Sequence, residues 1–251
     1  MSLEDETRAI AERVRLGIGP TDPIHNLLEL IEVDAGIPVI VLGLGNEGLA
    51  GAYMQRRGTP FILVNGSNHV VRMRFTLGHE FAHHTLGHRQ SWDKANYFFS
   101  KDPQEVGANA FAAEFLLPRQ AVVQWHERRG GRAADLEAVA RLGHEYGISA
   151  LAALFRLDAA VSLSPALKRR LDRSIRDGEH LSLPQRPSWP HRHDSLEDAQ
   201  NRERRLPNAA ETILVGAVIK GVLSSAHAAG HLGIEESEVQ RMLAAYTATD
   251  E

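Results

Sequence analysis

The hydrophobic and polar positions along the chain predict mostly helices, several of them with recognisable end signals. Ser2 and Asp22 precede helical patterns as N-caps, and Pro23 occupies the first helical position of the second one. Asp102 and a proline after it open a later helix, which ends at Pro118. The expected helices cover residues 2–15, 23–32, 68–87 and 103–117, with further helices within residues 119–156.

Two short segments have the pattern of strands instead. Residues 37–44 are rich in β-branched side chains and contain or adjoin glycines, which favours a strand. Residues 51–65 predict a β-hairpin that turns near Arg57 and Gly58. Together with the helices, these segments indicate an α+β fold in which a small, mostly antiparallel sheet packs against a helical core.

The composition changes in the last third of the chain. Residues 183–209 are rich in proline and charge, which is typical of a linker. We therefore expect a main domain over residues 1–160, a helical extension over 161–182, this linker, and a small helical C-terminal module over 210–251.

Composition also excludes several classes of protein. The chain has no cysteine, so a disulfide framework, a thiol nucleophile and a cysteine-based zinc site are excluded. The net charge of −4 provides no overall basic field that would favour nucleic acid. The acidic start "MSLEDETRAI" lacks the apolar core of a secretion signal, and Lys220 interrupts the longest apolar run. A cytoplasmic protein is expected.

The segment "TLGHEFAHHTLGH" (residues 76–88) holds four of the 13 histidines and contains an HExxH motif. Residues four apart lie one above the other on a helix, so His79 and His83 can reach one metal ion. Zinc lowers the pKa of a water molecule at its open position to about 7, and Glu80, on a neighbouring face, is placed to take the proton. A stripe of Val71, Phe75, Gly78, Ala82 and Leu86 is expected to pack on the core.

The third ligand is not settled by spacing alone. His88 comes one residue too early for the metzincin pattern, and no methionine lies between Met73 and Met242 to form a Met-turn. If the helix continues, His84 and His88 point away from the other two histidines. Of two glutamates on the later helix, Glu114 is the weaker candidate. For Glu105 two roles stay open: a metal ligand, or the N3 position of a capping box.

The chain resembles the ImmA/IrrE family of metallopeptidases over roughly residues 20–156. A hairpin that ends in "FILVN" precedes "TLGHEFAHH", and a downstream helix repeats the family pattern with Glu105, Ala108-Asn109, Phe111-Ala112 and Leu116-Leu117-Pro118. The resemblance implies a zincin-type core, with Zn²⁺ held by His79, His83 and Glu105 and with Glu80 as general base. Many members carry a second acidic residue where this chain has Gly107.

The resemblance also implies the kind of substrate. Studied members are cytoplasmic, site-specific endopeptidases that cleave a helix-turn-helix repressor and so switch on phage, mobile-element or stress-response genes. Sequence suggests no clear oxyanion stabiliser; Tyr97 and His144 are the weak candidates. Mn²⁺ stays open as an alternative to Zn²⁺, because a His₂Glu site with open positions accepts either.

Two segments have the residue pattern of a helix-turn-helix motif. In residues 224–243 the second helix offers three glutamates against Arg241, which is the wrong charge for a DNA reader, so we expect a docking or packing module without direct DNA binding. Residues 135–156 are expected to complete the main domain or to help position the substrate. The mixed charges of residues 167–176 indicate a solvated helix face, and His191 and His193 an exposed polar segment.

Three other functions are alternatives to the endopeptidase. A metal-bearing module could sequester a repressor without cutting it, but such a binder would not need Glu80. A DNA-binding regulator is disfavoured by the charge of the tail. A different metallohydrolase would use His79, His83 and His88, and substitution of Glu105 or His88 would separate it from the peptidase by metal retention.

Overall fold

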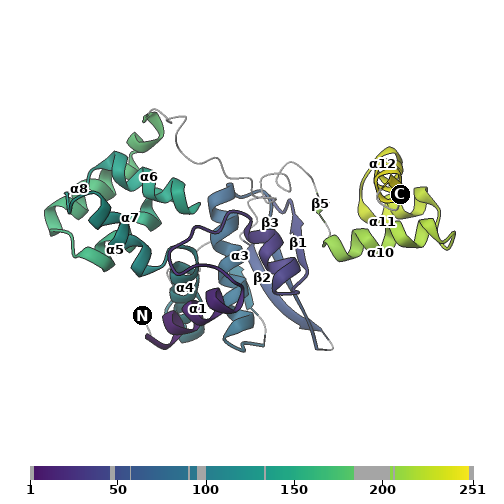
Figure 1. Cartoon of the computed structure of the whole chain (residues 1–251), viewed down its shortest axis with the longest axis horizontal. Helices are drawn as coiled ribbons and strands as arrows, with labels where there is room; N and C mark the ends of the chain where they lie inside the picture. Colours follow the sequence, from purple (N-terminus) through teal and green to yellow (C-terminus); the bar gives the residue numbers. More distant parts are fainter. Residues whose placement is uncertain are drawn as a thin grey trace.

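The structure is a computed structural model of the whole chain, and it describes residues 3–45, 49–56, 58–89, 91–94, 100–132, 134–183, 204–205 and 207–248. In Figure 1, a sheet with helices packed beside it lies between a group of helices from the middle of the chain and three helices at the C-terminal end. The expected α+β fold is confirmed.

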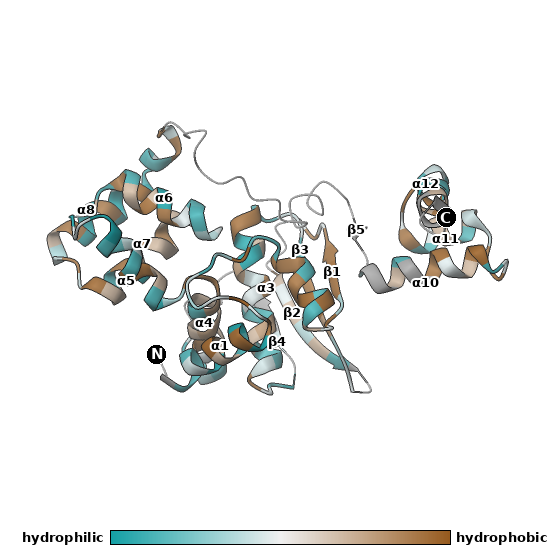
Figure 2. Ribbon diagram, viewed as in Figure 1, coloured by the Kyte–Doolittle hydropathy of each residue, from teal (hydrophilic) through white to brown (hydrophobic). Residues whose placement is uncertain are grey.

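Within the described residues, the sheet has five strands in the order β4-β2-β3-β1-β5. Strand β1 runs parallel to β3, and the other three pairings are antiparallel, as expected for a mostly antiparallel sheet. The hairpin of β2 and β3 turns at Gly58, whose φ of 82° suits glycine. Strand β1 is hydrophobic along its length (Figure 2). The strands are Val39–Leu42 (β1), Leu49–Arg56 (β2), Thr59–Asn65 (β3), Ser91–Lys94 (β4) and Arg204–Arg205 (β5).

Three helices carry or support the motif residues: α1 (Leu3–Arg15), α3 (Val70–Thr85) and α4 (Pro103–Leu116). Helix α3 packs against strands β2 and β3 and against α4, and α4 in turn packs against α1 (Figure 1). The expected stripe on α3 is present except for Val71: Gly78 and Ala82 are buried and Phe75 and Leu86 pack against the core, but Val71 is not among the residues packed on it. Met73, Leu77 and Phe81 lie in the core as well, because α3 is enclosed by the sheet and by α4.

The predicted start of the second helix is wrong. Helix α2 covers only Leu27–Glu29 and continues as a π-helical turn, η1 (Leu30–Asp34). The N-cap of α2 is Asn26, whose Oδ1 accepts a hydrogen bond from the Glu29 N–H at 3.3 Å. The residues before it stay out of the helix because their carbonyl oxygens accept hydrogen bonds from buried arginines. Arg13 donates to the carbonyl of Asp22 at 2.5 Å, and Arg74 donates to that of Ile24 at 2.7 Å.

The middle of the chain forms four helices and a short 3₁₀ helix. These are Arg119–Arg128 (α5), Leu136–Tyr146 (α6), Ala150–Val161 (α7), Pro165–Arg176 (α8) and Glu179–Ser182 (η3). Gly147, in the left-handed conformation, joins α6 to α7, and its carbonyl accepts from Arg74 Nε of α3 at 2.9 Å. This buried contact fixes the α6–α7 turn against the helix that carries the HExxH motif.

Three C-terminal helices, Asn208–Ile219 (α10), Ser225–Leu232 (α11) and Glu236–Ala248 (α12), have a small apolar cluster of their own. Its buried members are Ala228, Ala229, Leu232 and Val239. Most of the expected linker, including His191 and His193, lies outside the described residues. No helix in the described part of the chain is both long and apolar enough to cross a membrane.

Candidate metal centre

Three side chains from two helices converge on one point. His83 Nε2 is 3.0 Å from His79 Nε2, and Glu105 presents Oε2 at 3.2 Å from His79 Nε2 and Oε1 at 3.6 Å from His83 Nε2. This is the one group of metal-ligating side chains found among the described residues. The HExxH spacing predicted His79 and His83, and the family resemblance implied Glu105.

The donor set fits a tetrahedral zinc site. Bonds of about 2.0–2.1 Å at tetrahedral angles separate ligand atoms by about 3.3–3.4 Å, and the three observed separations bracket that value. The side chains of His79 and His83 are almost fully buried, whereas that of Glu105 is 19% exposed. Three protein ligands on a tetrahedral ion leave its fourth position open for water or substrate.

Small residues let α4 approach α3 closely enough for this convergence. A Cβ placed on Gly78 of α3 would lie 3.8 Å from the Cβ of Ala112 and 3.5 Å from Leu116 Cδ1 on α4. Gly78 lies immediately before His79, so the two helices are in contact beside the motif. The close approach expected from Ala112 is therefore present.

The capping interpretation of Glu105 is not supported by the contacts at the start of α4. Asp102 caps the helix, as predicted, by accepting from the Gln104 N–H at 2.9 Å. Its own N–H, which a capping box would pair with Glu105, donates to Ser100 Oγ at 3.2 Å instead. The carboxylate of Glu105 is turned toward the two histidines.

Glu80 follows His79 in the motif, and its carboxylate is held from strand β4. Ser91 Oγ donates to Glu80 Oε2 at 2.5 Å and accepts from the Tyr53 N–H of β2 at 3.0 Å. Glu80 and Ser91 are both buried. Gly51 of β2 leaves the space for the carboxylate, because a Cβ there would lie 2.7 Å from Glu80 Oε1. Sequence reasoning missed Ser91 and Gly51, and only knowledge of the strand pairing would have found them.

The expectation for His84 and His88 is half right. His84 points away from the cluster, and its Nδ1 is 3.1 Å from the hydroxyl of Tyr53. His88 does not point away, because α3 ends at Thr85 and the chain turns back. Its Nδ1 is 2.8 Å from His83 Nδ1. Burial lowers the pKa of both His84 and His88, which favours their neutral forms.

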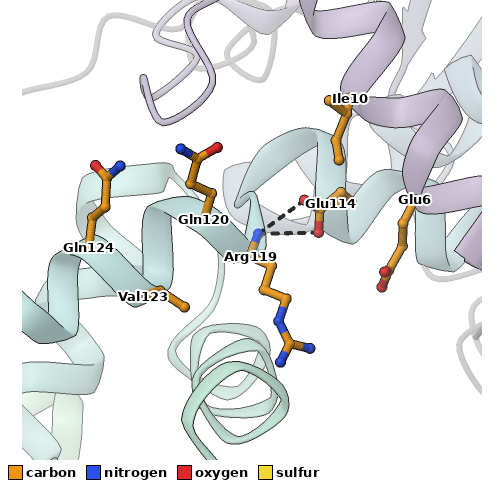
Figure 3. Close-up of a pocket in the computed structure, with 7 residues that line it drawn as sticks. All are labelled: Glu6, Ile10, Glu114, Arg119, Gln120, Val123 and Gln124. Carbon is orange, nitrogen blue, oxygen red and sulfur yellow. Dashed lines mark hydrogen bonds between the residues drawn. The ribbon is translucent and has the colours of Figure 1, made fainter.

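Glu114 has a separate role on the opposite face of α4. It forms a buried ion pair with Arg156 of α7, and its carboxylate accepts from the Arg119 N–H at 3.1 and 3.2 Å. Figure 3 shows it in a pocket of about 500 Å³ between α1, α4 and α5, which contains none of the three converging side chains. Glu114, the weaker of the two candidates, is therefore not a member of the converging group.

The two weak candidates for an oxyanion stabiliser gain no support. Tyr97 lies outside the described residues, and His144 lies on α6 and is not one of the three converging side chains. Among the residues that the structure describes, no donor for a substrate carbonyl oxygen is therefore assigned.

Comparisons with known proteins agree with this geometry. The family model of the IrrE N-terminal-like domain, a peptidase family, matches residues 33–158 and so includes the HExxH motif and Glu105. The "Uncharacterized immunity region protein 2" of Bacillus phage phi105 is 34% identical over 91 residues, which are 36% of this chain. The aligned part spans 57% of the phage protein's length.

Proposed function

The chain belongs to the metallopeptidase family of the IrrE N-terminal-like domain, and from that premise we propose that it is a zinc-dependent, site-specific endopeptidase. The convergence of His79, His83 and Glu105 is the observation that carries the proposal, and Glu80 follows His79 in the motif. A protein substrate follows from the peptidase family.

The three ligands fit Zn²⁺, with Mn²⁺ as the alternative. When bound, such an ion supplies a Lewis acid that polarises the scissile carbonyl and lowers the pKa of a water molecule at its open position. The ligands use both imidazoles through Nε2 and one carboxylate, so the site carries one negative charge from the protein.

Glu80 performs the proton transfers in the proposed mechanism. Its carboxylate takes a proton from the attacking water as the water oxygen bonds to the scissile carbonyl carbon. It then passes that proton to the amide nitrogen as the carbon–nitrogen bond breaks, which releases a carboxyl and an amine end. Ser91 holds the carboxylate in place for both transfers by donating a hydrogen bond to Oε2, and Gly51 leaves room for it because it has no side chain.

A helix-turn-helix transcriptional repressor is the proposed substrate. The support is the resemblance to the ImmA/IrrE family and the name of the phage relative, which places that protein in an immunity region. Cleavage would derepress phage, mobile-element or stress-response genes.

We propose a role for each segment of the chain. Residues 1–160 form the peptidase domain, 161–182 extend it, 183–209 link it, and 210–251 form a docking module. The last helix of that module, α12, carries Glu236 and Glu238 in its first turn, so we do not assign direct DNA binding to it.

The test is a cleavage assay with the full-length chain. The purified protein, loaded with zinc or with manganese, is mixed with the helix-turn-helix repressor encoded nearest to it, and fragments are identified by mass spectrometry. A single cut that Glu80→Ala abolishes is the expected result. A stable complex without cleavage under either metal would favour the alternative, a metal-bearing module that sequesters its repressor.

A further inference from the structure

His88 is not one of the three converging ligands, yet it contacts one of them. Its Nδ1 lies 2.8 Å from His83 Nδ1, and the two rings have centroids 4.9 Å apart and planes inclined at 60°. The contact is on the side of His83 opposite to its Nε2, the atom that faces His79 and Glu105. His88 is therefore placed to act on the metal centre through His83.

The end of α3 brings His88 to this position. Gly87 adopts the left-handed conformation with a φ of 76°, its N–H donates to the carbonyl of His84 at 3.1 Å, and the His88 N–H donates to that of His83 at 2.9 Å. These two hydrogen bonds define a Schellman motif, in which the second residue after the cap commonly contacts the third residue before it. Here those two residues are His88 and His83.

Metal binding determines the direction of the hydrogen bond between the two rings. A neutral imidazole has one protonated and one unprotonated nitrogen, and only the unprotonated nitrogen can bind a metal ion. If His83 binds through Nε2, its proton is on Nδ1. That N–H can only donate, so His88 Nδ1 must accept and His88 must carry its own proton on Nε2.

We propose that His88 is a positioning residue of the metal centre. Its Nδ1 accepts the proton of His83 Nδ1–H, which holds His83 in the tautomer and ring orientation that present Nε2 to the ion. The inference rests on the proposed metal site. Histidine ligands of metal ions usually donate their second N–H to such a partner, and loss of the partner typically lowers metal affinity about 10- to 100-fold.

Four variants of the full-length chain separate this role from packing and from direct ligation. His88→Leu removes the acceptor and keeps a side chain that branches at the same atom. His88→Asn restores an acceptor, because Asn Oδ1 is as many bonds from Cα as His Nδ1. His84→Leu is the matched control, since it removes a nearby imidazole, on the last turn of α3, that contacts Tyr53 rather than a ligand. Glu105→Gln shows the effect of losing a ligand.

The measurement is the zinc dissociation constant, from competition with a chelator of known affinity, together with the melting temperature of the metal-free protein. His88→Leu should weaken zinc binding about 10- to 100-fold, His88→Asn should recover most of the loss, and His84→Leu should bind like the wild type. The metal-free melting temperatures of the two His88 variants should agree.

Four results would overturn the inference. Wild-type affinity in His88→Leu would show that the contact is not used. Equal losses in the Leu and Asn variants would assign the effect to ring packing. A loss as complete as that of Glu105→Gln would make His88 a ligand. A wild-type chain that binds no zinc would remove the proposed metal centre itself, which distinguishes that failure from the other three.

Discussion

The hydroxyl of Ser91 donates a 2.5 Å hydrogen bond to Glu80 Oε2 and accepts the backbone N–H of Tyr53. The bond joins the edge strand β4 to the helix that carries the HExxH motif. Because the Tyr53 N–H can only donate to the Ser91 hydroxyl, the proton of that hydroxyl is left for the carboxylate of Glu80. The sheet thus fixes the orientation of the proposed general base.

Ser91→Ala should therefore slow catalysis without weakening metal binding. Loss of one hydrogen bond to a charged group costs about 1.5 kcal/mol, or roughly tenfold in kcat. KM and the zinc affinity should stay near their wild-type values. Ser91→Thr keeps a hydroxyl and should be less affected. Ser67→Ala is the control, since Ser67 Oγ serves only a loop N–H, that of Gly45, in the contacts described. A Ser91→Ala enzyme with wild-type kcat would contradict this role.

Gly51→Ala should displace the carboxylate of Glu80. The added methyl group would lie 2.5 Å from Thr76 Cγ2 and 2.7 Å from Glu80 Oε1, well inside van der Waals contact. We expect a loss of about 1–3 kcal/mol in the free energy of unfolding and a lower kcat. Gly216→Ala, which meets no atom within 4 Å, is the matched control. Urea unfolding and kcat measured on both variants would test this, and equal behaviour of the two would refute it.

Gly87→Ala should disturb the turn that brings His88 to His83. A Cβ at this position meets no atom within 4 Å, so the cost is that of the left-handed backbone alone, about 1–2 kcal/mol. The free energy of unfolding should fall by that amount, and zinc affinity should fall with it because the Schellman turn is strained. Unchanged stability and unchanged zinc affinity would show that the turn has no such role.

Zinc should stabilise the fold in proportion to its affinity. A ligand that binds only the folded state adds about 2.7 kcal/mol when its free concentration is 100 times its dissociation constant. Chelation should therefore lower the melting temperature of the wild type and leave that of Glu105→Gln nearly unchanged. Differential scanning calorimetry with and without chelator tests this, and equal shifts in the two proteins would argue against Glu105 as a ligand.

Local signals explain why the metal cluster could be predicted. The HExxH spacing places His79 and His83 on one face of a helix, and Asp102 with Pro103 marks the start of α4. Spacing left two roles open for Glu105. The structure favours the ligand role, because Ser100 takes the hydrogen bond that a capping box would need.

Tertiary contacts explain what the sequence did not reveal. The carbonyls of Asp22 and Ile24 bond to buried arginines, which moves the start of the second helix to Asn26, a choice that no local pattern could show. Ser91 reaches Glu80 only through the pairing of β4 with β2. The contact of His88 had a local signal, since Gly87, where the predicted helix ends, is a residue type that often turns the chain at a helix end.

The most direct test of the metal centre is a count of metal ions per chain. Native mass spectrometry of the full-length wild type, Glu105→Gln and Asp102→Asn would supply it. Asp102→Asn is the matched control, because asparagine caps a helix as well as aspartate and the change removes a neighbouring carboxylate. We predict one zinc ion in the wild type and in Asp102→Asn, and loss of that ion in Glu105→Gln. A zinc ion retained by Glu105→Gln would contradict the proposed ligand set.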